Sequence, residues 1–368
     1  MKCRLVLRLI VPAAIVAGAA CRPGEDRARG PTLRLLESTP LRESESAYVA
    51  RPSLSAVGPD GSLYVTDLFL GRVARFSRDG ELMQLYGRQG DGPGELRSIS
   101  LPVLIDDTTL AVADQAHLRF NLYDRRTGMF RRTRSVRGIL RSAQLREGVL
   151  WAGDMVDELG TTVLRWDLSR DSLRYLGNLP APYKESPVLR GIHPSSQIQV
   201  WADTVLLGLG GSDVIRVLDT TGSVLDSFTI PVVRRRGASA ERVRRMTSPD
   251  LPFPDMFSMI SHLMAIHRTR DGTLILVHAD GRIEGRRITD SLFVSLVSPD
   301  RRSACVDTYL HTTDVSQPVV AFDDDTLLVL NQQIAGDEIR TIVDRFAVES
   351  EDCLWIPTAP DANGRTGS

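Results

Sequence analysis

The chain has 368 residues, of which 42% are hydrophobic and 25% are charged. Its 45 Lys and Arg residues are balanced by 46 Asp and Glu residues, so no basic excess points to a nucleic-acid-binding protein. The length exceeds that of one ordinary hydrophobic core, yet no linker divides the chain, which favours a closed repeat architecture.

Residues 1–20 have the pattern of a targeting segment. Lys2, Arg4 and Arg8 supply positive charge, and the following stretch to residue 20 is largely apolar but short for a membrane span. Gly18-Ala19-Ala20-Cys21 resembles a bacterial lipobox, which implies that Cys21 is lipidated and becomes the first residue of the mature chain. An ordinary secretory signal, in which Cys21 has no role, is the alternative.

Residues 21–31 are polar, with Pro and Gly, which is typical of a flexible tether. Position 22 holds Arg22, where the lipoproteins that well-studied Gram-negative bacteria retain in the inner membrane carry aspartate. The lipobox resemblance therefore implies an anchor in the outer membrane, with the folded part facing the periplasm or the cell surface. The membrane is then one partner, through the N-terminal lipid.

The segment 57–96 carries the clearest structural pattern, which predicts a four-stranded antiparallel unit. Leu63-Tyr64-Val65 is a short apolar run after the turn Pro59-Asp60-Gly61, and residues 72–76 alternate polar and apolar side chains. Residues 82–86 follow the hairpin turn Arg78-Asp79-Gly80 as an outer strand. Residues 87–95 contain four glycines and one proline, which predicts a crossing between units rather than a regular element.

This segment closely resembles the NHL repeat, which builds the blades of β-propellers. The residues that match are Asp60-Gly61, Leu63-Tyr64-Val65, Asp67, Arg72-Val73, Phe76, Asp79-Gly80, Gly87 and Gly92-Pro93-Gly94-Glu95. The resemblance covers about 40 residues and weakens elsewhere in the chain.

A short apolar run after an acidic or glycine turn recurs along the chain, with starts at residues 63, 110, 149, 205, 274 and 327. This spacing predicts an all-β, six-bladed β-propeller of four-stranded antiparallel blades over residues 32–358, with seven blades as the alternative. We expect residues 32–37 to close the last blade and 354–356 to add a strand to it. Blade five is the least regular, and we expect its strands at 282–289 and 292–297. Residues 359–368 lack a strand pattern and predict a disordered tail.

The longest interval holds a basic insertion. Ser239 is a suitable N-cap for one or two helical turns, and residues 251–254 are expected to be extended. One interpretation is a loop that binds a partner; the other is a solvated connection. The candidate binding residues are Arg234, Arg235, Arg236, Arg242, Arg245, Phe253 and Phe257.

The remaining chemistry-bearing residues give weak signals. Cys305 and Cys353 can form a disulfide in an oxidising compartment, although two buried free thiols fit equally well. The six histidines are scattered, without the spacing of a metal site, and no catalytic motif is present. We therefore expect no metal, no cofactor and no catalytic residue. The four tryptophans could stack on a sugar, but each falls in a predicted strand, where packing between blades is favoured.

These observations favour a monomeric, non-enzymatic binding or scaffold lipoprotein of the cell envelope. Its ligand would be a protein, a glycan or a small molecule. The NHL resemblance also implies an alternative, a propeller enzyme such as a metal-dependent lactonase or lyase. A third hypothesis is a subunit that works in envelope assembly or export.

Overall fold

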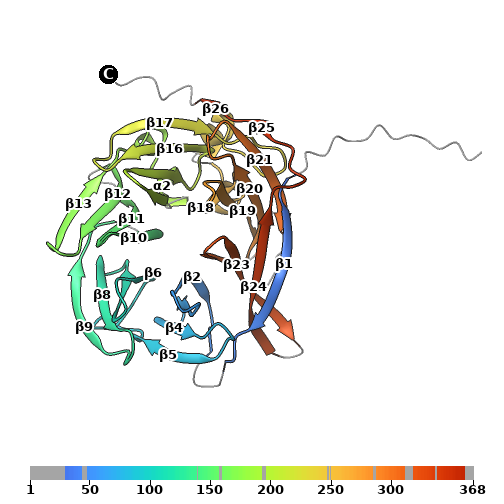
Figure 1. Ribbon diagram of the computed structural model, residues 1–368. Coiled ribbons are helices and arrows are strands. Elements are labelled where there is room, and N and C mark those ends of the chain that lie inside the picture. Colours follow the sequence, from blue (N-terminus) through green and yellow to red (C-terminus); the bar gives the residue numbers. More distant parts are fainter. Residues whose placement is uncertain are drawn as a thin grey trace, which may run out of the picture.

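The computed structural model describes residues 30–43, 48–138, 140–156, 160–192, 196–246, 248, 250–284, 287–310, 318–335 and 338–360. Within them, six antiparallel sheets surround a central axis and form a β-propeller (Figure 1). Each sheet is one blade. The predicted fold class is confirmed, with six blades rather than seven.

The strands of the first three blades, written from the axis outward, are β2 (Pro52–Val57), β3 (Leu63–Asp67), β4 (Arg72–Phe76) and β5 (Leu82–Tyr86); β6 (Ile99–Leu104), β7 (Thr109–Asp114), β8 (Arg119–Asp124) and β9 (Phe130–Ser135); and β10 (Ser142–Arg146), β11 (Val149–Val156), β12 (Thr161–Asp167) and β13 (Ser172–Leu176). The segment 57–96 therefore contains three whole strands of blade one. Only Val57 of its innermost strand falls inside the predicted unit, so the prediction of a complete blade there was wrong by one strand.

Blades four and five consist of β14 (Ser196–Trp201), β15 (Thr204–Leu209), β16 (Val214–Asp219) and β17 (Val224–Thr229), and of β18 (His262–Arg268), β19 (Leu274–Glu284), β20 (Arg287–Val297) and β21 (Ser303–Leu310). Blade six consists of β22 (Val319–Asp323), β23 (Thr326–Ala335), β24 (Glu338–Glu349) and β1 (Thr32–Pro40). The strand expected at 282–289 was wrong, because that stretch contains the last residues of β19 and the first residues of β20, which pair with each other.

The hydrophobic core lies between the blades. The second strand of a blade is covered on both faces, so β3 and β7 are buried at every position and read as continuous apolar runs. Among the described residues, one apolar cluster fills each of the six interfaces between neighbouring blades. The innermost strands also contact one another around the ring, including β2 with β22, where the ring closes.

The N-terminal strand closes the ring, as predicted. β1 pairs antiparallel with β24, from Thr32 opposite Glu349 to Pro40 opposite Ile342. Arg34 adds an ion pair with Glu349 at 2.7 Å. Because this strand joins the two ends of the chain in one sheet, separation of the first and last blades requires the loss of a whole strand.

The C-terminal segment takes a different path from the predicted one. The short strand β25 (Ile356–Pro357) pairs with β21 of blade five, and β26 (Ala359–Pro360) pairs with β17 of blade four. The expectation that 354–356 belong to blade six was wrong, because β1 already occupies its outer edge. Residues 359 and 360 likewise extend a sheet instead of starting a tail. The rest of that expected tail, like the targeting segment with Cys21, lies outside the described residues.

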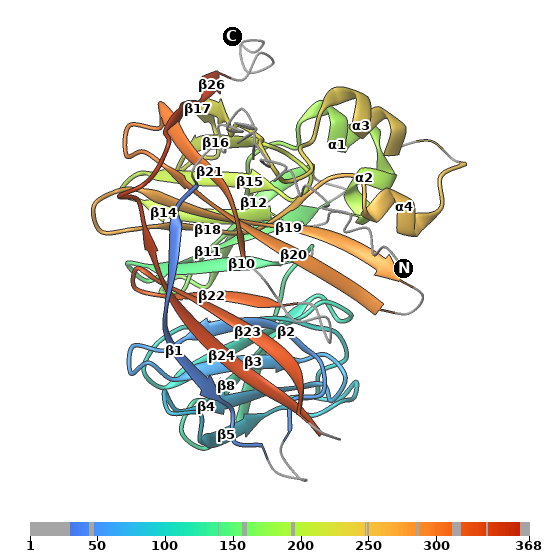
Figure 2. The same ribbon diagram turned by 90° about the vertical axis from the view of Figure 1, so that its right-hand side faces the viewer.

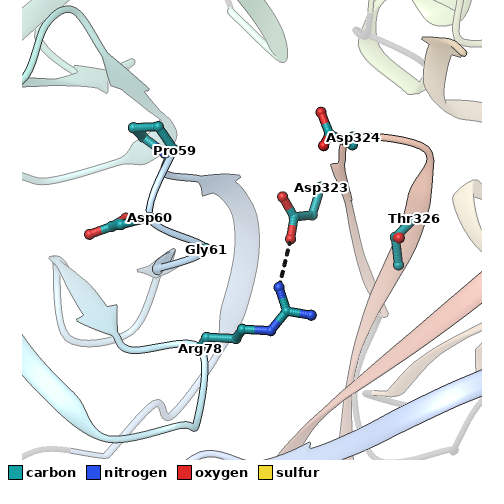
Figure 3. Close-up of a pocket in the computed structure, with 7 residues that line it drawn as sticks. All are labelled: Pro59, Asp60, Gly61, Arg78, Asp323, Asp324 and Thr326. Atoms are coloured by element: carbon teal, nitrogen blue, oxygen red, sulfur yellow. Dashed lines mark ion pairs between the residues drawn. The ribbon is translucent and has the colours of Figure 1, made fainter. Parts of the chain in front are cut away.

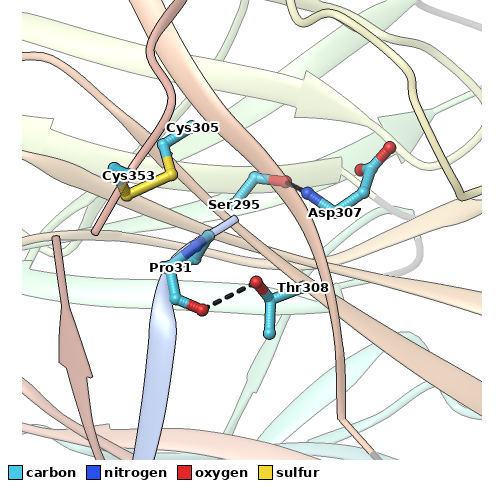
Figure 4. The surroundings of a disulfide bond; sticks show 6 residues. All are labelled: Pro31, Ser295, Cys305, Asp307, Thr308 and Cys353. Carbon is cyan, nitrogen blue, oxygen red and sulfur yellow. Dashed lines mark hydrogen bonds between the residues drawn. A yellow bond between two sulfur atoms is a disulfide. The ribbon is translucent and has the colours of Figure 1, made fainter. Parts of the chain in front are cut away.

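A disulfide fastens this segment to blade five (Figure 4). Cys305 on β21 is bonded to Cys353, with their Cα atoms 5.6 Å apart. The N-terminal segment crosses the same blade, where the Thr308 hydroxyl donates a hydrogen bond to the Pro31 carbonyl at 2.7 Å. Blade five thus contacts both the residue that precedes β1 and the segment that carries Cys353 and β25.

The two longest crossings between blades carry short helices. α1 (Ala181–Glu185) and α2 (Pro187–Ile192) lie between blades three and four, and α3 (Ala240–Met246) and α4 (Phe253–Phe257) lie between blades four and five. All four gather on one side of the disc (Figure 2). Ser239 does precede α3, and its hydroxyl accepts the Arg242 amide. The extended run expected at 251–254 was wrong from Phe253 onward, where α4 begins. No helix in the described part of the chain has the length and apolar character of a membrane span.

Candidate functional site

The two faces of the disc differ in what they present. The insertion face carries the crossings between blades, including α1–α4 and the segment 230–261. The turn face carries the short turns that follow the innermost strands, at residues 58–62, 105–108, 147–148, 202–203, 269–273 and 324–325. The candidate binding residues named from the sequence belong to the segment between blades four and five on the insertion face.

Two of those candidates are structural anchors. The Arg235 side chain is fully buried between the blades, and its guanidinium pairs with the carboxylates of Asp213 and Asp307. Its Nε lies 3.1 Å from Asp307, whose carboxylate is also fully buried. Arg236 pairs with Asp280 at 3.2 Å. The interpretation of Arg235 and Arg236 as binding residues is not supported by their positions, because both guanidinium groups form ion pairs with aspartates of the fold.

The Asp307 carboxylate also holds the backbone of the insertion. Asp307 accepts hydrogen bonds from the amides of Val233 and Arg234 at 2.6 and 2.8 Å. The start of the insertion is therefore wrapped around one buried acid of blade five. The basic run was recognisable in the sequence, but its partner lies more than seventy residues away and could not be assigned.

The other five candidates remain at or near the surface. Arg234, Arg242, Arg245 and Phe253 are exposed. Phe257 is half-buried, and its ring lies 5.4 Å from the ring of His262. The structure does not gather these five side chains around one cavity among the described residues.

A pair of buried histidines lies beneath this insertion. His262 begins β18, His278 lies on the neighbouring strand β19, and both are buried. Burial, reinforced by the positive charge of Arg235 and by the neighbouring His262, holds the pKa of His278 well below its ordinary value of 6.5. His278 is therefore neutral in the folded protein at neutral pH, in keeping with a packing role.

This burial predicts a loss of stability in acid. The unfolded chain takes up a proton at His278 as the pH falls below about 6.5, whereas the folded chain does not, so stability falls with falling pH by up to about 1.4 kcal/mol per pH unit for this group. His278→Leu should remove one such proton from the pH dependence of the free energy of unfolding, measured by urea denaturation between pH 8 and pH 5. An unchanged slope would contradict the buried, neutral state. Burial also lowers the pKa of His267, so the variant should keep the part of the pH dependence of stability that comes from His267.

The turn face presents a different set of groups. Trp201 ends β14, the innermost strand of blade four, and 49% of its surface is exposed. The guanidinium of Arg268, at the end of β18 in blade five, lies 3.6 Å from the centre of a Trp201 ring. Arg146, at the end of β10 in blade three, lies 5.7 Å from a ring centre of the same side chain. Three consecutive blades thus bring one aromatic and two cationic side chains together.

A chain of amide hydrogen bonds fixes these three strands to one another. The Gln144 side-chain carbonyl on β10 accepts the Val200 amide of β14 at 2.6 Å. The Gln199 carbonyl on β14 accepts the Arg268 amide of β18 at 3.2 Å. The strand ends that carry Arg146, Trp201 and Arg268 are therefore held in register across two blade interfaces.

On the other side of blade five the charged groups compensate one another. The His267 ring stacks on Phe322 of blade six with 4.3 Å between ring centres, and its Nε2 lies 3.7 Å from Asp325. Arg270 pairs with Asp324 at 2.6 Å. This part of the turn face therefore joins blades five and six, and the charge of Arg270 is paired with that of Asp324.

A polar pocket of about 480 Å³ lies farther along the turn face, between blades six and one (Figure 3). Its lining residues are Pro59, Asp60, Gly61, Arg78, Asp323, Asp324 and Thr326. Arg78 pairs with Asp323 at 3.5 Å, and Asp60 pairs with Arg75 at 2.6 Å. The pocket can take a small polar molecule, but its acids already have basic partners. Among the described residues, no three His, Cys, Asp or Glu side chains gather as a metal-binding group.

Comparison with known proteins identifies the fold but no family. Neither a protein-family model nor a curated protein matches the chain by sequence. A DUF4221 family member from Bacteroides vulgatus is similar in structure, with a TM-score of 0.61 at 10% identity over 88% of this chain and 99% of that one. A protein described as exported, from Bacteroides fragilis, has a TM-score of 0.59 at 14% identity over 86% and 95% of the two chains.

An enzyme is also among the similar structures. A catalytically inactive variant of virginiamycin B lyase from Staphylococcus aureus, determined with quinupristin, has a TM-score of 0.50 at 14% identity over 83% of this chain and 98% of that one. At these identities the similarity shows the propeller architecture alone.

Sequence analysis missed the grouping on the turn face. It placed all four tryptophans in strands, with packing as the favoured role. That is right for the buried Trp151 and Trp166, but Trp201 and Trp355 are exposed. A usable signal was present for Trp201, because a large aromatic residue directly before a turn at the end of an innermost strand must lie at the rim of the central channel.

Proposed function

We propose that this protein is an exported, lipid-anchored propeller that binds its ligand without transforming it. The anchor is Cys21, the outer membrane is the address, and the blades are of the NHL type. The protein acts as a monomer, and its ligand is a glycan, a small molecule or a protein of the envelope. Similarity in architecture to an exported Bacteroides protein supports this placement.

One observation carries the binding role. The buried charged groups of the insertion face, such as Arg235 and Asp307, are used to hold the crossing between blades four and five. The exposed Trp201 and the half-buried Arg268 instead lie at the ends of innermost strands, and no carboxylate among the described residues pairs with Arg268. Exposed aromatic and arginine side chains on a rigid scaffold are typical of recognition surfaces.

A thermal-shift screen of the purified mature protein tests the proposal. A ligand that binds only the folded state raises Tm with a concentration dependence set by its Kd. We expect one class among envelope glycans, organic acids and peptides to raise Tm and to be recovered chemically unchanged. Recovery of a cleaved or ring-opened product would favour the enzyme alternative and contradict the proposal.

A further inference from the structure

Arg268 holds a positive charge that the fold does not neutralise. Among the described residues, its guanidinium pairs with no carboxylate; its only side-chain hydrogen bond goes to the carbonyl of its neighbour Thr269, at 3.4 Å. Arg270, two residues along the same turn, is by contrast paired with Asp324 at 2.6 Å. A half-buried arginine without an acid partner retains most of its capacity to bind an anion.

Trp201 supplies a flat apolar surface, and the Arg268 guanidinium lies over one of its rings, 3.6 Å from the ring centre. Half of its side chain is open to solvent, although Trp151 and Trp166 of blade three are almost completely buried. Arg146 approaches the same side chain from the opposite blade interface, and among the described residues its one acidic partner is the exposed Glu147, at 3.4 Å. The site therefore combines an aromatic surface with two guanidinium groups.

The geometry is set before any ligand arrives. The backbone amide of Arg268 is held by Gln199, the residue two positions before Trp201, so the two side chains approach each other because their strands are locked together. Gln199 is itself hydrogen-bonded to Gln144 at 3.1 Å, which extends the lock to the strand that bears Arg146. A prearranged site loses less conformational entropy on binding.

We propose that Trp201, Arg268 and Arg146 form a binding site for an acidic sugar, a pyranose ring that carries a carboxylate. The guanidinium fork matches a carboxylate in two parallel hydrogen bonds, and the exposed part of the indole packs against the C–H face of the ring. This inference rests on the proposed function and names the ligand class for it.

Isothermal titration calorimetry with a tetramer of galacturonic acid tests the site on the full mature protein. We expect saturable binding, and a galactose tetramer without carboxylates should bind at least about tenfold more weakly, since it cannot form the charge-assisted hydrogen bonds to the guanidinium groups. Arg268→Met should weaken binding of the acidic tetramer by about tenfold or more, and Trp201→Leu should also weaken it.

Arg270→Met is the matched control, because it removes an arginine from the same turn that already has an acid partner. Its affinity should stay within about twofold of wild type, and all variants should keep the wild-type Tm within a few degrees. Equal weakening by Arg268→Met and Arg270→Met would show a general charge effect and overturn the inference.

Two small anions test whether the site recognises an aromatic acid or any anion instead of an acidic sugar. If benzoate binds as tightly as the tetramer, the ligand is an aromatic acid and the sugar assignment is wrong. If inorganic phosphate displaces the tetramer at equal concentration, the arginines hold any anion and the assignment is also wrong. If wild type does not bind the tetramer but another ligand raises Tm, this inference fails while the proposed function stands.

Discussion

Arg235→Met should lower the free energy of unfolding by about 3–5 kcal/mol, the largest loss that we expect from a single substitution outside the apolar core. The methionine can fill much of the space, but it leaves the carboxylate of Asp307 buried without its guanidinium, and that of Asp213 loses the same partner. Chemical denaturation of the purified protein at neutral pH measures the change.

Arg234→Met is the control for this effect. Arg234 is the preceding residue in the same basic run, but its side chain is exposed, so its replacement should change the free energy of unfolding by less than about 0.5 kcal/mol. A similar loss in both variants, or no loss in either, would contradict the assignment of Arg235 as the anchor of the insertion.

Replacement of both Cys305 and Cys353 by alanine should lower stability by about 2–4 kcal/mol. The bond joins residues 48 positions apart, so it restricts the unfolded chain, and it also fastens the segment that carries β25 and β26 to blade five. Thermal or chemical denaturation of the variant and of wild type measures the loss.

Reduction provides an independent comparison. Treatment of wild type with dithiothreitol should reproduce most of the loss seen in the double variant, whereas the variant itself should not respond to the reductant. A wild-type protein whose Tm is unaffected by complete reduction would contradict a stabilising role for the bond.

The outer part of each blade was predictable from the sequence for a physical reason. The second, third and fourth strands are packed between blades or alternate between core and solvent, so they read as apolar or alternating runs bounded by turns. β4 and β5 fall at the predicted residues, 72–76 and 82–86. The crossing at 87–95 was also predictable, and within it the Glu95 carboxylate accepts the Gly92 amide at 2.9 Å.

The innermost strands were not predictable in the same way. β2 (PSLSAV) and β10 (SAQLR) are only half-buried, because they border the central channel and lack a consistent apolar face. The positions of these strands depend on contacts with the next blade, such as the hydrogen bond from the Val200 amide to Gln144. Those contacts cannot be predicted from a single sequence. Arg146, Trp201 and Arg268 lie at the ends of three different innermost strands, β10, β14 and β18, so their grouping depends on such contacts and was not predictable from the sequence.

The insertion illustrates the opposite error. Its arginine run was correctly located, and Ser239 was correctly placed before a helix, but both interpretations of the run, a binding loop and a solvated connection, assumed that its arginines face solvent. In fact Asp213, Asp280 and Asp307, from three separate stretches of the chain, draw Arg235 and Arg236 into the fold. A basic run in sequence does not distinguish a surface patch from an anchor when its acidic partners are distant.

We propose that the propeller binds its ligand without catalysis, and the metal content of the purified mature protein tests this proposal. The metal-dependent enzyme alternative requires a stoichiometric divalent ion. Elemental analysis by mass spectrometry after dialysis against metal-free buffer should therefore find well below one equivalent of any divalent metal. One equivalent of a divalent ion that resists dialysis, and whose removal by a chelator abolishes turnover of a lactone, would contradict the account.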